Sequence, residues 1–199
     1  MSRYFIESDD CNLLKFNYKG FNVKNPNQKK KEYYADETLP IQNDKLSYIH
    51  ITYGSRPFYV KTPIMTVPFK ISEKDGSFQF SLQFTNYKDN EEMNRFYNLI
   101  RNIELQQMKF IGLDETNTEL YLSQIRRDKK KQYDPNLLIK IPFRYTKMEA
   151  DAYTKEGQPM NILSIHRFSK AECVIYIDRI WKFNDMFVCK WKLKTIHLR

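Results

Sequence analysis

The closing segment of the chain carries a regular alternation of lysines and apolar side chains. Lys190, Lys192 and Lys194 alternate with residues that include Trp191, so the lysines share one face of an extended strand and the apolar side chains share the other. A row of cations beside aromatic rings is the combination that binds the phosphates and bases of unpaired nucleic acid. The alternative interpretation is a solvated face, or an edge strand whose lysines prevent aggregation.

Positive charge is concentrated in two parts of the sequence. The whole chain has 33 Lys and Arg against 24 Asp and Glu, a formal net charge of +9. Residues 126–147 hold eight basic and two acidic residues, and residues 179–199 hold six and one. This imbalance favours a partner of negative charge. The residues that we select as candidate phosphate contacts are Lys61, Arg126, Arg127, Lys129, Lys130, Lys131, Arg144, Lys182, Lys190, Lys192 and Lys194.

Aromatic side chains are abundant, with 14 Tyr, 14 Phe and 2 Trp in 199 residues. Trp191 lies on the apolar side of its strand, which favours a place in the core. Trp181 stands beside Lys182 and near a turn, which makes it the better candidate for an exposed ring. The candidate stacking rings are Tyr48, Tyr53, Tyr59 and Trp181, and the alternative for each tyrosine is packing.

Catalytic and metal-binding motifs are absent from the sequence. It has no phosphate-binding loop, dinucleotide fingerprint, HExxH motif or nucleophile elbow, and His50, His166 and His197 stand apart from one another. We therefore expect a protein that is not an enzyme and has no catalytic residues, metal site or cofactor.

Three widely spaced cysteines predict an intracellular, reducing environment. The longest near-apolar stretch is Cys173–Ile177, far short of the ~20 residues of a membrane span, so no membrane association is expected.

The periodicity of apolar residues predicts strands, then a helix, then strands again. Asn90 or Asp89 can cap a helix over residues 90–109, and a weaker helical pattern covers 115–127. The remaining pattern predicts an α+β fold, mostly β, on a largely antiparallel, barrel-like sheet. We expect one domain over 1–199, with an irregular strand and loop at 1–45 and a helical insertion at 89–127. The expected strands are 14–19, 47–53, 56–69, 78–84, 137–143, 173–181 and 186–198.

Three segments in this order carry a resemblance to a known family. They are Lys61–Phe69 (KTPIMTVPF), Leu138–Phe143 (LIKIPF) and the tryptophan-bearing hairpin Ile180–Leu193 (IWKFNDMFVCKWKL). Together they resemble the single-stranded DNA-binding proteins of nucleocytoplasmic large DNA viruses, an OB-fold group akin to phage replication single-strand binders. The resemblance implies an OB-like antiparallel barrel with a helical insertion. The phage proteins end in an acidic tail, whereas this sequence ends in a basic segment, so regulation by such a tail is not carried over.

The resemblance and the basic and aromatic pattern lead to one main functional hypothesis. It is sequence-tolerant binding of single-stranded DNA in viral DNA replication, recombination or repair, in a viral factory of the host cytoplasm or in the nucleus. RNA and replication proteins are further candidate partners. The alternatives are a structural virion or scaffold protein with a basic interaction surface, and an RNA-binding module. Preference for single strands over duplex separates the main hypothesis from the structural one.

Overall fold

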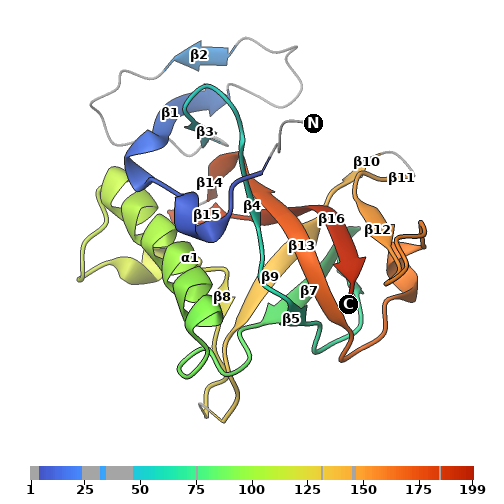
Figure 1. Cartoon of the computed structure of the whole chain (residues 1–199). Coiled ribbons are helices and arrows are strands. Elements are labelled where there is room, and N and C mark those ends of the chain that lie inside the picture. The colour runs from blue at the N-terminus through green and yellow to red at the C-terminus, as the bar shows by residue number, and fades with distance from the viewer. Residues whose placement is uncertain are drawn as a thin grey trace.

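The computed structural model describes residues 5–23, 32–34, 47–74, 76–130, 132–144, 147–183 and 185–199 (Figure 1). These residues form two large β-sheets and a separate two-stranded one, with one long helix beside them, so the expected mostly-β fold with a helix inserted between strands is confirmed. Four short 3-10 helices also occur in this part of the chain: η1 (Ser8–Asp10), η2 (Leu13–Lys15), η3 (Thr118–Leu120) and η4 (Ile162–Ser164).

The larger sheet closes into a barrel of five strand positions. Its strands are β4 (Phe58–Lys61) with β5 (Met65–Thr66), β7 (Ser77–Gln83), β9 (Asn136–Ile141), β16 (Trp191–Leu198) and β13 (Lys170–Ile177). Neighbouring strands pair antiparallel around the barrel, and the parallel pairing of Trp191 with Ile139 closes it. The side chains of β7 alternate between the core and the surface. Phe80 and Leu82 are buried, while their neighbours along the strand are partly exposed.

Five short strands lie at the margins of the barrel. β6 (Ser72–Lys74) pairs with β7, β8 (Ile125–Arg126) pairs with β9, and β12 (Asp151–Tyr153) pairs with β16. β10 (Phe143–Arg144) and β11 (Lys147–Met148) form a separate hairpin. The expected strand 56–69 is divided into β4 and β5 around Pro63, because proline has no amide hydrogen to give to a ladder.

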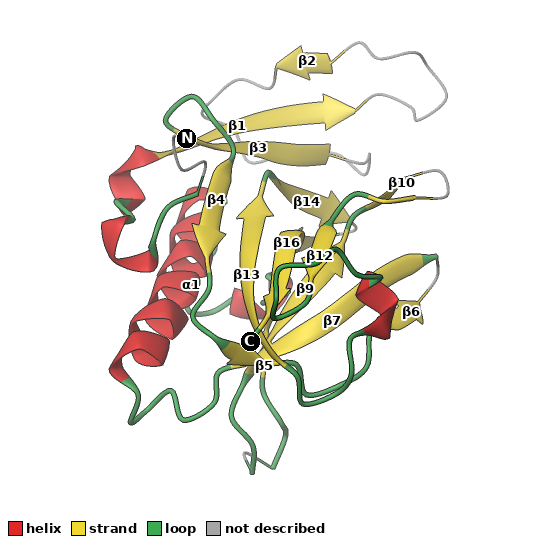
Figure 2. Ribbon diagram, turned by 45° about the vertical axis from the view of Figure 1, so that its right-hand side comes forward, coloured by secondary structure: helices red, strands yellow, loops and turns green. Residues whose placement is uncertain are grey.

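A second sheet lies against one end of the barrel, with the strand order β15–β14–β3–β1–β2 (Figure 2). Its strands are β1 (Phe16–Val23), β2 (Glu32–Tyr34), β3 (Ser47–Tyr53), β14 (Arg179–Phe183) and β15 (Met186–Cys189). Asp178 alone separates β13 from β14, and Lys190 alone separates β15 from β16. One long hairpin therefore leaves the barrel, joins the second sheet and returns to the barrel.

The helix α1 (Glu91–Phe110) follows β7 in the chain and packs against both sheets. The side chain of Asn90 accepts a hydrogen bond from the amide of Met93, so the cap expected from the sequence is formed. Phe96 contacts Phe84 at the end of β7, with ring centroids 6.0 Å apart, and Phe110 stacks on Tyr18 of β1 at 4.7 Å. The helix thus fixes the second sheet relative to the barrel.

The prediction of a helix over residues 115–127 is wrong. The chain instead forms the single turn η3 and then runs extended into β8. Long-range hydrogen bonds account for the extended form: the amide of Leu122 donates to the carbonyl of Phe187 at 2.7 Å, and the amide of Gln124 donates to the carboxylate of Glu104 at 2.7 Å. These bonds to β15 and α1 replace the local bonds of a helix whose sequence pattern is weak.

Candidate nucleic-acid interface

A hollow of about 330 Å³ opens where the long hairpin leaves the barrel. It receives side chains from the second sheet and from two strands of the barrel. Its lining residues are Lys140 of β9, Asp178, Arg179, Trp181 and Phe183 along β14, Val188 and Lys190 at the end of β15, and Lys192 of β16. Three residues predicted from the sequence, Trp181, Lys190 and Lys192, therefore lie together in one concave site.

The register of the β14–β15 hairpin explains why these side chains converge. Trp181 pairs with Val188, and the next pair along the ladder, Ile180 with Cys189, is buried. Because side chains alternate across a strand, Arg179 and Phe183 lie on the same face of β14 as Trp181. One face of the hairpin thus fills the core, and the other lines the hollow.

The hollow has two aromatic side chains, one packed on a buried ring and one exposed to solvent. The ring of Trp181 lies 5.2 Å from the ring of Tyr48, which is only 4% exposed, so Tyr48 supports Trp181 from below. The guanidinium of Arg179 lies 4.5 Å from the ring centroid of Tyr48 and 5.7 Å from that of Trp181. Phe183 is 67% exposed. Trp181 is held in place on one side, and Phe183 offers a free ring beside it.

Positive charge dominates the hollow. Lys140, Arg179, Lys190 and Lys192 line it together with a single carboxylate, that of Asp178. Burial, and then the neighbouring charges of Lys190 and Lys192, lower the pKa of Lys140 below its usual value. Several cations lining one hollow attract a polyanion.

Two further candidate lysines flank this site without lining it. Lys182 lies on the opposite face of β14 from Trp181, and its ammonium is 3.6 Å from the carboxylate of Asp185. Lys194 is half-buried on β16, at the point where the pairing of β16 with β13 shifts register.

Two of the candidate tyrosines and Lys61 lie elsewhere, in packed or paired surroundings. Tyr53 packs against Phe16 and Phe58, and the hydroxyl of Tyr53 accepts a hydrogen bond from the amide of Asn12. The ring of Tyr59 contacts that of Tyr176 on the barrel, at 5.1 Å. The ammonium of Lys61 lies 2.9 Å from the carboxylate of Glu172, which lowers the pKa of that carboxyl although burial acts against it. All three remain untested as DNA contacts.

The remaining basic candidates are spread over two other places. Arg126 and Arg127 lie at β8, where the guanidinium of Arg127 donates a hydrogen bond to the hydroxyl of Tyr97 and lies 5.5 Å from its ring. Lys129 and Lys130 are exposed in the turn that follows, and Lys131 is outside the described residues. Arg144 is exposed on β10. They stay predictions, separate from the hollow.

The hollow also contains residues that the sequence analysis did not select. Lys140 and Arg179 could have been selected from the alternation of their strands. Lys140 lies between the buried Ile139 and Ile141, and Arg179 is two residues from Trp181. Phe183 was visible only as part of a hairpin turn. For Asp178 the sequence held no signal, because its position depends on where two sheets meet.

The described residues contain neither a metal-binding cluster nor a helix that could span a membrane. No group of three or more His, Cys, Asp or Glu side chains in that part of the chain is arranged to hold a metal ion. None of its helices has the length and apolar character needed to cross a bilayer. Burial raises the pKa of the thiols of Cys173 and Cys189, so both stay protonated and pack as small apolar groups.

Comparisons with known proteins bear on the fold. No family model and no curated protein sequence matches this chain. The solved structures that it resembles include the single-stranded DNA-binding protein from bacteriophage Enc34, with a TM-score of 0.53, 11% identity, and coverage of 75% of this chain and 84% of that one. The barrel has an OB-like fold.

Two further solved structures have lower TM-scores. The single-stranded DNA-binding protein gp2.5 of bacteriophage T7 gives a TM-score of 0.47 at 13% identity, over 71% of this chain and 86% of that one. The Enc34 protein in complex with ssDNA gives 0.45 at 10% identity, over 83% and 96%.

Proposed function

We propose that this protein binds single-stranded DNA with little sequence preference and catalyses no reaction. Its role would be to protect and organise unpaired DNA during viral DNA replication, recombination or repair. The assignment to the single-stranded DNA-binding proteins of nucleocytoplasmic large DNA viruses is part of the same proposal. The observation that carries it is the hollow in which Trp181 and Phe183 lie among four cations.

The place of the hollow on the barrel supports the proposal. OB-folds bind oligonucleotides on the face of their second and third strands and on the loops after the first and fourth strands. In this barrel Lys140 lies on the third strand, β9, and the β14–β15 hairpin is the connection between the fourth strand, β13, and the fifth, β16. The hollow therefore occupies a position where proteins of this architecture bind oligonucleotides.

The chemistry of the hollow fits unpaired nucleic acid. Every base has a flat face that can stack on Trp181 or Phe183, and stacking contributes about 1–3 kcal/mol per base whatever the sequence. Lys140, Arg179, Lys190 and Lys192 would contact the phosphates on either side of a stacked base. The similarity to a protein described as a single-stranded DNA-binding protein adds to this support.

The test is a titration of fluorescein-labelled oligo-dT, followed by anisotropy at several salt concentrations. We expect an affinity that falls linearly with salt on logarithmic axes, by roughly 0.7 for each phosphate neutralised on a single strand. Unlabelled single strands should displace the probe at lower concentration than duplex of the same length. Equal competition by duplex, or an affinity independent of salt, would support a structural role instead. Stronger competition by oligo-rU than by oligo-dT would identify an RNA-binding protein.

A further inference from the structure

A second hollow, of about 410 Å³, lies between α1 and residues 118–127. The residues of α1 that line it, among them Tyr97, Arg101 and Met108, recur every three or four positions and so share one face of the helix. From Tyr97 to Met108 this face is about 16 Å long, at a rise of ~1.5 Å per residue. That is the length of roughly five residues of an extended chain.

The rim of this hollow carries two arginines, neither of which forms an ion pair with a carboxylate of the described residues. Arg101 is exposed and makes no hydrogen bond or ion pair with any residue that the structure describes. Arg127 is exposed as well, and its hydrogen-bond partners in the described chain are the hydroxyls of Tyr87 and Tyr97. Both guanidiniums are therefore available to an acidic ligand, and each matches a carboxylate with two parallel donors.

The inside of the hollow is partly apolar, and its single carboxylate is already occupied. Leu105 is 47% exposed, and Met108 and Ile125 line the hollow beside it. The two oxygens of Glu104 accept hydrogen bonds from the hydroxyl of Ser123 and the amide of Gln124, both at 2.7 Å. Glu104 therefore holds residues 123–124 against α1, while Leu105 stays exposed and Met108 and Ile125 are partly exposed.

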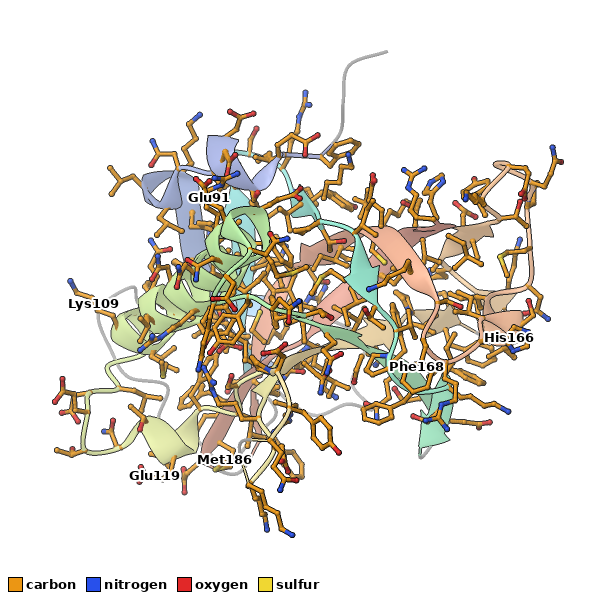
Figure 3. All side chains as sticks on the ribbon, turned by 60° about the horizontal axis from the view of Figure 1, so that its bottom comes forward. Glu91, Lys109, Glu119, His166, Phe168 and Met186 are labelled. Carbon is orange, nitrogen blue, oxygen red and sulfur yellow. The ribbon has the colours of Figure 1, made fainter. Side chains whose placement is uncertain are left out.

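These features fit a protein segment better than a nucleic acid. The two rings in the lining, Tyr97 and Tyr121, are each 5% exposed, so neither offers a face on which a base could stack. The hollow also lies across the second sheet from Trp181. The side chain of Cys189 faces α1, where it contacts Gln107, whereas Val188 and Lys190 face the first hollow. Figure 3 shows the segment that carries Glu119 between the C-terminal half of α1 and Met186 of β15.

We propose that this second hollow docks a short extended segment of a partner protein in which Asp or Glu stands next to a large apolar residue. The acidic residue pairs with Arg101 and Arg127, and the apolar residue covers Leu105 and Met108. The inference does not depend on the binding of DNA, since the two hollows share no lining residue.

The experiment selects peptides from a phage-displayed library of random 12-residue sequences on the unsubstituted protein. Selected peptides should contain Asp or Glu beside Leu, Ile, Met or Phe. In titrations of a labelled selected peptide, Arg101→Glu should weaken binding by about tenfold or more, the effect of reversing a charge that contacts the ligand. The matched control is Lys109→Glu, at the C-terminal end of the same helix and outside the hollow (Figure 3). It should leave peptide affinity unchanged.

The same variants separate this proposal from DNA binding. Arg101→Glu should keep the unfolding temperature and the oligo-dT affinity of the unsubstituted protein, because Arg101 is exposed and lines a different hollow from Trp181. The proposal is overturned if no peptide is enriched, if the enriched peptides lack acidic residues, or if both variants bind the peptide equally well. Displacement of the peptide by oligo-dT would also overturn it, since the surface would then bind nucleic acid.

Discussion

The ammonium of Lys192 lies 2.7 Å from both carboxylate oxygens of Asp178, inside the hollow that we propose for single-stranded DNA. The same carboxylate lies 3.9 Å from the guanidinium of Arg179. A phosphate that approaches Lys192 must therefore compete with Asp178. The pair has two consequences: Asp178 holds Lys192 in position before DNA arrives, and it lowers the affinity that the four cations would otherwise give.

Replacing Asp178 with Asn should strengthen DNA binding. The substitution removes the negative charge of the hollow, so oligo-dT affinity should rise by roughly tenfold, or about 1.4 kcal/mol. Lys192 then gains a counterion to release, and the logarithmic salt dependence should steepen by about 0.7. The control is Asp185→Asn, which removes a charge from the exposed tip of the same hairpin, outside the hollow. An equal gain in both variants would mean that net charge alone is responsible.

Lys190 and Lys61 should contribute differently to the affinity for oligo-dT, although both were selected from the sequence as candidate phosphate contacts. Lys190 lines the hollow and has no ion pair with any described residue, whereas Lys61 is paired with Glu172. We expect Lys190→Gln to weaken oligo-dT binding and to reduce the salt dependence by about 0.7, the value for one lost phosphate contact. Lys61→Gln should leave both quantities unchanged. If Lys61→Gln has the larger effect, the DNA follows a different surface.

Glu104 should make folding stability depend on pH. Burial raises the pKa of its carboxyl above the ordinary value of 4.5, and hydrogen bonds from Ser123 and Gln124, together with the charge of Arg126, act against this rise. The folded state therefore holds the proton more tightly than the unfolded state. The contribution is fully present below the unfolded pKa and is lost as pH rises through the folded pKa.

The measurement is urea unfolding of the protein and of Glu104→Gln between pH 4 and pH 8. The variant loses a hydrogen bond at every pH, but it has no proton to release. The free energy of unfolding of Glu104→Gln, relative to that of the unsubstituted protein, should therefore increase as pH rises. A difference between the two unfolding free energies that stays constant from pH 4 to pH 8 would contradict a raised pKa of Glu104.

Local pattern was enough to predict much of the fold and little of the site. The β-branched and aromatic residues before Gly54 predicted the strand Ser47–Tyr53 with the bounds that the structure shows, and Asn90 was one of the two residues predicted to cap the helix. Alternation placed Trp191, which is 1% exposed, on the apolar side of its strand. These features depend on neighbours in the chain, where period and capping chemistry act directly.

The features that could not be predicted depend on contacts distant in sequence. Residues 121–126 are extended because the amides of Leu122 and Gln124 donate hydrogen bonds to Phe187 and Glu104, and a helical pattern carries no information about such partners. The convergence of Lys140 with Arg179 depends on the pairing of Lys192 with Lys140 where the barrel closes. A run of lysines identifies positive charge, but only the register of the sheets determines which charges share a hollow.

Tryptophan fluorescence during titration with oligo-dT tests the central claim most directly. The chain has two tryptophans, and Trp191 is buried in the barrel, so a change in emission on binding reports on Trp181. We predict that oligo-dT quenches the emission of the unsubstituted protein, and that Trp181→Phe still binds by anisotropy but without quenching. Trp181→Ala should lose about 1–3 kcal/mol of binding free energy. Binding by anisotropy with no quenching, and full affinity in Trp181→Ala, would contradict the assignment of this hollow as the DNA site.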